Sequence, residues 1–99
     1  MNIADTLDAA ADILVERGHC KSALTDGEGR HCALGAILAT ETWGADQCLV
    51  AVYDYLGLEK YPSLKGYGIV NWNNAEEREG WEVVNAFRHT AKSLRGGAE

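Results

Sequence analysis

Residues 32–44 decide the fold and read Cys-Ala-Leu-Gly-Ala-Ile-Leu-Ala-Thr-Glu-Thr-Trp-Gly. Apolar side chains cover most of the circumference of the helix that we expect over about 32–42, and a helix that is apolar nearly all round is usually a central one. Gly35 and Ala36 would let a neighbouring backbone approach closely, and Gly44 ends the helix. The sequence therefore predicts that this helix is the most buried element of the domain.

Three more helices are expected around it, each marked by apolar residues at steps of three and four. We place them at about 3–17, 46–56 and 80–94, and a glycine directly follows each of the first two, as is typical of helix ends. The stripe of the first helix is the clearest of the three. Its members are Ile3, Leu7, Ala10 and Leu14.

The segments between these helices are rich in turn-forming residues. Residues 20–24 and 30–32 flank an Asp-Gly-Glu-Gly turn, and this pattern predicts a small β-hairpin between helices one and two. Residues 58–74 contain Pro62 and two glycines, and we interpret them as one long irregular loop. The expected fold class is therefore mainly α, with α+β at the margin: a compact domain of four helices and one small hairpin. We expect a single domain over 1–99, with its ordered core at about 3–94.

Length and composition narrow the class of protein. With 99 residues, of which 46% are hydrophobic, the chain has enough apolar surface for one core and too little length for a large cofactor-binding fold. No apolar run approaches the ~20 residues that cross a bilayer. A net charge of −6 argues against binding to nucleic acid or to an anionic membrane. The acidic N-terminus predicts a cytoplasmic protein, and the odd number of cysteines, three, predicts reduced thiols. We expect no cofactor.

Two adjacent His-Cys pairs are the sharpest chemical feature of the chain, His19-Cys20 and His31-Cys32. Imidazole and thiolate groups bind zinc, but neighbouring residues on a strand point to opposite faces, so each pair would supply one ligand. Cys48 or His89 would then have to complete the coordination. We expect small thiols packed between hairpin and helix, and no bound metal.

Cys32 has a second interpretation because it lies at the expected start of a helix, where the thiolate form of a cysteine is favoured. His19 or His31 could act as its base and Asn73 as the residue that orients the base, as in a Cys-His-Asn hydrolase. Such triads ordinarily lie in larger folds that have a substrate cleft. We therefore expect that the protein is not an enzyme and that Cys32 is largely protected.

Charges of opposite sign line the first and the last helix. Such stripes predict that the terminal helices pack side by side and pair across their rims, at about 0–1 kcal/mol per exposed pair. A basic docking face for an acidic partner is the alternative interpretation. The residues concerned are Asp5, Asp8, Asp12, Glu16, Arg88, Lys92 and Arg95.

Aromatic residues concentrate in the second half of the chain, and we expect most of them, Trp81 included, in the core. We place a partner-binding site on the loop over 58–74, especially at Tyr61, Tyr67 and Trp72, although Trp72 itself is expected to be buried. The leading hypothesis is a small interaction or regulatory module that binds a protein, with a homodimer as one arrangement. A small-molecule pocket lined by Trp72, Tyr67 and the second helix is the alternative.

Two motifs are distinctive, the Cys-Ala-Leu-Gly-Ala-Ile segment over 32–37 and the pair Trp72-Asn73. Together with the helix that ends before Gly18, their order resembles a family of short uncharacterised proteins found in actinobacteria and their phages. The resemblance covers about 3–94. Members often have Gly-Trp-Cys where this chain has Gly18-His19-Cys20, and Trp-Asn-Asp where it has Trp72-Asn73-Asn74. The resemblance implies fold, source and compartment and leaves the function open. The leading hypothesis of an interaction module includes a phage-derived chain that acts on a host protein in the host cytoplasm.

Overall fold

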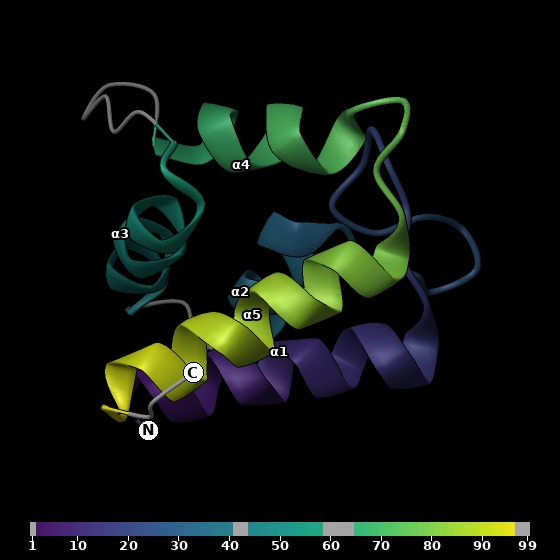
Figure 1. Ribbon diagram of the computed structural model, residues 1–99. Helices are drawn as coiled ribbons and strands as arrows, with labels where there is room; N and C mark the ends of the chain where they lie inside the picture. Colours follow the sequence, from purple (N-terminus) through teal and green to yellow (C-terminus); the bar gives the residue numbers. More distant parts are fainter. Residues whose placement is uncertain (1, 41–43, 59–64, 97–99) are drawn as a thin grey trace.

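The computed structural model describes residues 2–40, 44–58 and 65–96, apart from the side chains of 65–67, and these form five helices joined by loops (Figure 1). The mainly helical class is confirmed, whereas the count of four helices and the hairpin are wrong. None of the described helices is both long and apolar enough to cross a membrane. The helices are α1 (Ile3–Arg17), α2 (Ala33–Thr40), α3 (Ala45–Leu56), α4 (Lys65–Asn74) and α5 (Gly80–Leu94).

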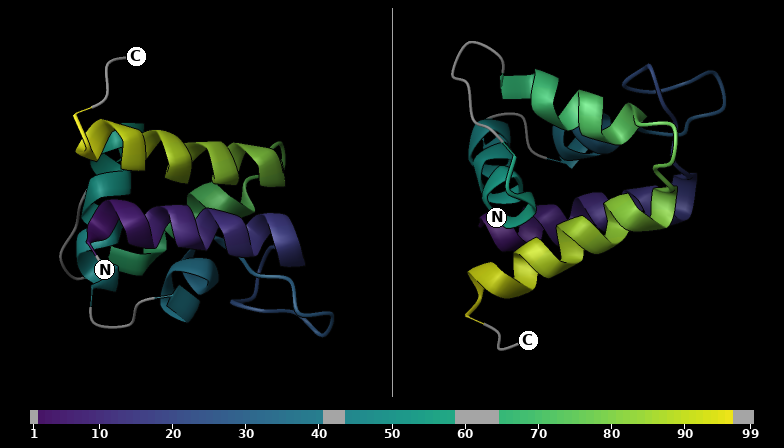
Figure 2. Two further views of the ribbon diagram at one scale, coloured as in Figure 1. Left: turned by 90° about the horizontal axis from the view of Figure 1, so that it is seen from below. Right: turned by 45° about the horizontal axis from the view of Figure 1, so that its top comes forward.

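The terminal helices α1 and α5 lie side by side and run in opposite directions (Figure 2). Their rims are joined by ion pairs: Arg95 contacts Asp5 and Asp8, each at 2.6 Å. Arg88 contacts Asp12 at 2.8 Å. The predicted pairing of the two charge stripes is thus confirmed for these residues, and it fixes the register of α1 against α5.

The surface position of these pairs limits what they contribute, and Asp8 provides the test. Asp8 lies 2.6 Å from Arg95 and 3.7 Å from Arg88, and its side chain is one-third exposed. We expect Asp8→Asn to lower the free energy of unfolding by less than about 1 kcal/mol, because water and salt screen exposed pairs. Chemical denaturation at low and high salt measures this loss, with Glu16→Gln on the same helix as control. A loss above about 2 kcal/mol at high salt would contradict this assignment.

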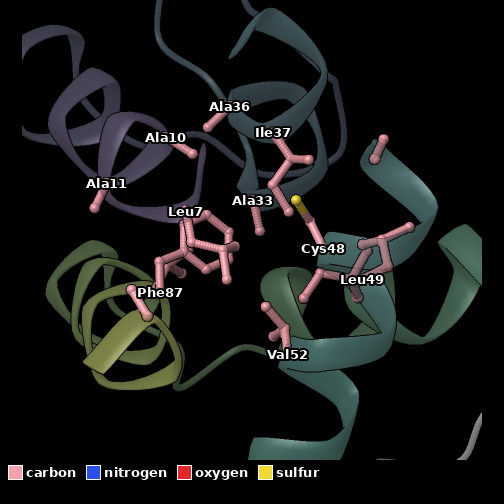
Figure 3. Packing of buried hydrophobic residues seen from close by; sticks show 14 of the residues in the cluster. Leu7, Ala10, Ala11, Ala33, Ala36, Ile37, Cys48, Leu49, Val52 and Phe87 are labelled. Atoms are coloured by element: carbon pink, nitrogen blue, oxygen red, sulfur yellow. The ribbon is translucent and has the colours of Figure 1, made fainter. Parts of the chain in front are cut away.

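Helix α2 packs against α1, α3 and α4. Four of its eight residues are buried, including Ala36 and Ile37, which are fully enclosed. Figure 3 shows Ile37 near Cys48 of α3, and Leu7 of α1 facing Phe87 of α5. The close approach of a backbone predicted at Gly35 is confirmed, because the backbone of Leu24 lies directly against this glycine.

Helix α4 occupies most of the stretch predicted as an irregular loop, so that prediction is wrong over 65–74. Two glycines in one helix disfavour it intrinsically. Contacts with the rest of the fold stabilise α4 despite this low helix propensity. Ile69 is fully buried, and its backbone N–H donates to the Tyr53 hydroxyl at 3.0 Å. A Cβ atom at Gly68 would lie 3.2 Å from the Tyr53 ring, so this glycine permits α4 to lie against α3.

The segment over 18–32 is a loop and not the predicted hairpin. His31 pairs with His19 in parallel sense and with Thr25 in antiparallel sense, and these are isolated bridges without strands. Backbone hydrogen bonds close the turn, with the Asp26 N–H donating to the Arg30 carbonyl at 3.0 Å. The Asp26 side chain adds to them, since its Oδ1 accepts from the backbone N–H groups of Glu28 and Arg30.

Candidate functional site

The residues predicted to bind a partner are only partly described. Tyr61 lies outside the described residues, and Tyr67 lies in α4 with its side chain outside them. Trp72, also in α4, is half-buried and packs against the core. The guanidinium of Arg78 lies over the Trp72 ring, 4.3 Å from its centre. The helical conformation of 65–74 thus replaces the expected loop, while a binding role for Tyr61 and Tyr67 stays a prediction.

The ends of the 18–32 loop bring the two His-Cys pairs side by side, because His19 and His31 form a parallel bridge and the Cys20 N–H donates to the His31 carbonyl at 3.0 Å. Cys48 lies in the core between α2 and α3, and His89 is bonded to Tyr55 on the surface. Over the described ranges, no group of three or more histidine, cysteine, aspartate or glutamate residues is arranged to hold a metal ion. The extra ligands that zinc would require are therefore not brought to these pairs.

The side chain of Asn73 connects the 18–32 loop with α2, and we call this set of contacts the Asn73 clamp. Its Oδ1 accepts from His19 Nε2 at 2.7 Å and from the backbone N–H of Ala33 at 2.9 Å. Its Nδ2 donates to the Cys20 carbonyl at 3.1 Å and to Asn74 Oδ1 at 3.0 Å. Asn73 is fully buried, so the clamp satisfies the first amide of α2 in the interior.

Cys32 serves as the N-cap of α2. Its Sγ accepts from the backbone N–H of Gly35 at 3.3 Å, and its carbonyl accepts from the N–H of Ala36 at 2.9 Å. The side chain is only 4% exposed. The triad hypothesis assigns catalytic roles to Cys32, His19 and Asn73. In the structure, Cys32 caps α2, and Asn73 joins His19 of the 18–32 loop to the first amide of α2.

Cys20 is also buried, and its Sγ donates to the carbonyls of Arg30 and Ala23 at 3.4 and 3.5 Å. Burial raises the pKa of the Cys20 thiol above its ordinary value. Because the folded thiol keeps its proton to higher pH than the unfolded one, its contribution to stability falls as pH rises through the unfolded pKa. The folded state therefore holds this cysteine in its unreactive form.

The three thiols should accordingly react slowly in the native protein. We expect alkylation of Cys20, Cys32 and Cys48 by iodoacetamide at neutral pH to be at least about a hundredfold slower than in urea, since each requires local opening. Mass spectrometry of peptides after timed quenching gives the rate for each cysteine. Rapid modification of Cys32 in the native protein would restore the nucleophile hypothesis.

The described surface has a shallow groove where the end of α3, the end of α4 and the first half of α5 meet; we call it the aromatic groove. It encloses about 250 Å³. Elements far apart in the sequence build it, because α4 turns back over α3 and the chain then enters α5 (Figure 1). Its lining residues are Tyr55, Leu56, Trp72, Arg78, Trp81, Glu82, Asn85, Ala86 and His89.

The walls of the aromatic groove are held by side-chain contacts. The Tyr55 hydroxyl lies 3.2 Å from His89 Nδ1, and the two rings meet edge to face. Opposite them, Arg78 donates to the Trp72 carbonyl at 3.0 Å and to Glu82 Oε2 at 3.0 Å. These contacts fix the side chains before any partner binds, which reduces the conformational entropy lost on binding.

Trp81 is the functional candidate that the sequence reasoning missed. It is 65% exposed, whereas we expected it in the core. The stripe predicted for the last helix ran through Val84, Phe87, Ala91 and Leu94. Phe87 and Ala91 are buried as expected, whereas Leu94 is exposed and Val83 is buried where Val84 was expected. Trp81 lies two residues before Val83, on the opposite side of the helix, so the burial of Val83 places it at the surface.

The fold and these contacts define a small helical domain with a buried amide clamp and an exposed aromatic groove. Over residues 1–93 the sequence matches the family of unknown function DUF6197, and the chain belongs to that family. The predicted resemblance to a family of unknown function is confirmed to that extent. Comparison with curated proteins and with solved structures gave no match.

Proposed function

We propose that this chain is a protein-interaction module that binds its partner through the aromatic groove. The observation that carries the proposal is the 65% exposure of Trp81, beside a Tyr55 that is 44% exposed. Tryptophan is a large side chain that is highly buried on average, so such exposure leaves a costly apolar surface in water. Tryptophan and tyrosine are also the residues that dominate binding energy at protein interfaces.

The size of the aromatic groove supports a protein partner over a small molecule. About 250 Å³ accommodates one or two side chains and lies below the range of about 300–1,000 Å³ that is typical of ligand pockets. A larger cavity of about 600 Å³ lies between the first turns of α1 and α3 and the end of α5, and Trp72 does not line it. The small-molecule hypothesis requires a pocket lined by Trp72, and this larger cavity is lined by other residues.

Tyr61 and Tyr67 remain part of the proposal because they precede Trp72 in the chain. Tyr67 belongs to α4, whose last turns form one wall of the aromatic groove, and Tyr61 precedes that helix in the sequence. We propose that both tyrosines take part in binding the partner together with Trp72 and Trp81. The burial of Cys32 at 4%, in a capping role, supports this binding function over a cysteine hydrolase.

The resemblance to proteins of actinobacteria and their phages supports a bacterial partner. We propose that the chain acts in the cytoplasm of such a cell, on a protein of the host where the chain is phage-encoded. An actinobacterial extract is therefore the appropriate source of partner candidates.

Capture from that extract with matched variants tests the proposal. We expect Trp81→Ala to reduce recovery of the partner at least about tenfold, because an interface tryptophan commonly contributes about 2 kcal/mol or more. Val15→Ala is the control, since Val15 is 63% exposed on α1 and does not line the aromatic groove. Quantitative mass spectrometry compares the three baits, and thermal melting checks that both variants fold.

A protein recovered equally by the wild type and Trp81→Ala binds elsewhere on the chain. If every specific protein behaves in this way, the aromatic groove is not the binding surface and the proposal is wrong.

A further inference from the structure

We infer that the side chain received by the aromatic groove is cationic, a lysine or arginine from an extended segment of the partner protein. This inference rests on the proposed function and adds the chemistry of its partner. It follows from three features: the apolar floor of the aromatic groove, the glutamates in and next to its lining, and an exposed amide between its aromatic residues.

The floor and walls suit the aliphatic stem of a long basic side chain. Leu56 and Ala86 form apolar parts of the lining, and Tyr55 and Trp81 present exposed rings above them. Lysine and arginine place their methylene stems on such surfaces while the charged head remains near water. A tryptophan face is also the most favourable aromatic surface for a cation.

The same wall already holds one cation in this way. The Arg78 guanidinium lies 4.3 Å from the centre of the Trp72 ring, and its Nη1 lies 3.0 Å from Glu82 Oε2. Tryptophan and glutamate thus combine to bind a guanidinium inside the molecule. Trp81 offers a second tryptophan ring in the aromatic groove, and this ring is exposed to solvent.

Glutamates in and next to the lining of the aromatic groove supply negative charge. Glu82 lines the aromatic groove, where it pairs with Arg78, and Glu76 and Glu77 precede Arg78 in the chain. Glu79 and Glu82 are engaged in the capping box of α5, whereas Glu76 and Glu77 are exposed. With a net charge of −6 on the whole chain, these carboxylates favour a basic segment over an acidic one.

The side chain of Asn85 indicates that the cation belongs to a peptide. It is exposed on α5, between Trp81 and His89 at helical spacing, and it lines the aromatic groove. A carboxamide both donates and accepts, so it can bind the N–H and C=O groups of an extended backbone. The aromatic residues beside it would then hold the side chain that this backbone carries.

Titration with single-residue probes tests the inference by NMR. The probes are N-acetyl-lysine methylamide, N-acetyl-arginine methylamide and N-acetyl-norleucine methylamide, of which the last has the lysine stem without the ammonium group. We expect both cationic probes to shift the Trp81 indole and Asn85 amide signals with a dissociation constant about two- to fivefold lower than that of norleucine. The preference should decrease at high salt and in Glu76→Gln/Glu77→Gln.

Two variants locate the binding. Trp81→Ala should abolish the shifts, whereas Val15→Ala should retain them. Equal or tighter binding of the norleucine probe would overturn the cationic inference and leave the proposed docking surface in place. The absence of shifts from all three probes would also overturn it, because a groove that binds a basic side chain of the partner should bind at least one of the cationic probes. Capture with Trp81→Ala decides the proposed function separately.

Discussion

Gly35→Ala should prevent the domain from folding or lower its free energy of unfolding by more than about 3 kcal/mol. A Cβ atom at Gly35 would collide with the carbonyl oxygen of Leu24 and lie 2.9 Å from its carbonyl carbon. That carbonyl accepts the backbone N–H of Cys32 at 3.1 Å. The methyl group would therefore push the 18–32 loop away from α2 and break the hydrogen bond that closes it. Urea denaturation followed by circular dichroism measures the effect.

Gly27→Ala is the matched control for this substitution. No atom lies within 4 Å of a Cβ built at Gly27, and its φ is not positive. We expect its free energy of unfolding to equal that of the wild type or exceed it by up to about 1 kcal/mol, since alanine restricts the unfolded chain. If Gly35→Ala were as stable as Gly27→Ala, the close packing of the loop on α2 would be wrong.

Asn73→Ala should cost about 3 kcal/mol of unfolding free energy. The substitution removes the acceptor for the Ala33 N–H and the donor to the Cys20 carbonyl, and it leaves both groups inside the protein. Each buried polar group without a partner costs about 1–3 kcal/mol, and the loss of the His19 contact adds to this. Thermal and chemical denaturation should report the loss consistently.

Asn85→Ala provides the comparison for Asn73→Ala because Asn85 is exposed on α5. We expect a change within about 0.5 kcal/mol, as is usual for surface substitutions. Equal stability of the two variants would show that the Asn73 clamp does not hold the loop to α2.

The helices that the sequence predicted well are those whose pattern is local. α1 begins and ends where its stripe and Gly18 placed it, with Asn2 as its N-cap. α5 likewise spans the predicted 80–94. The ion pairs between these helices were predictable because each stripe of charge lies on one face of one helix.

The elements that were missed depend on contacts between residues far apart in the chain. α4 is supported by the Tyr53 hydroxyl, sixteen residues before Ile69. The 18–32 loop is held by Asn73, which lies 54 residues after His19. Neither partner can be identified from local periodicity, so turn-forming residues suggested a loop in the first case and a hairpin in the second.

The candidate binding surface was predicted in part. The sequence directed attention to aromatic residues near Trp72, and Trp72 does form one wall of the aromatic groove. Tyr55 and Trp81 join it only through the packing of α3 and α5 around the end of α4. The exposure of Trp81 follows from the burial of Val83, where the predicted stripe of α5 had placed Val84.

Hydrogen–deuterium exchange of the chain, free and bound to the partner captured with it, tests the central claim most directly. If the aromatic groove is the docking surface, the strongest new protection should lie in the amides of residues 55–58, 71–75 and 81–89, which build it. The loop over 20–31 and the solvent-facing side of α1 should exchange as in the free chain. Protection confined to α1 or to that loop, with the groove segments unchanged, would contradict the account.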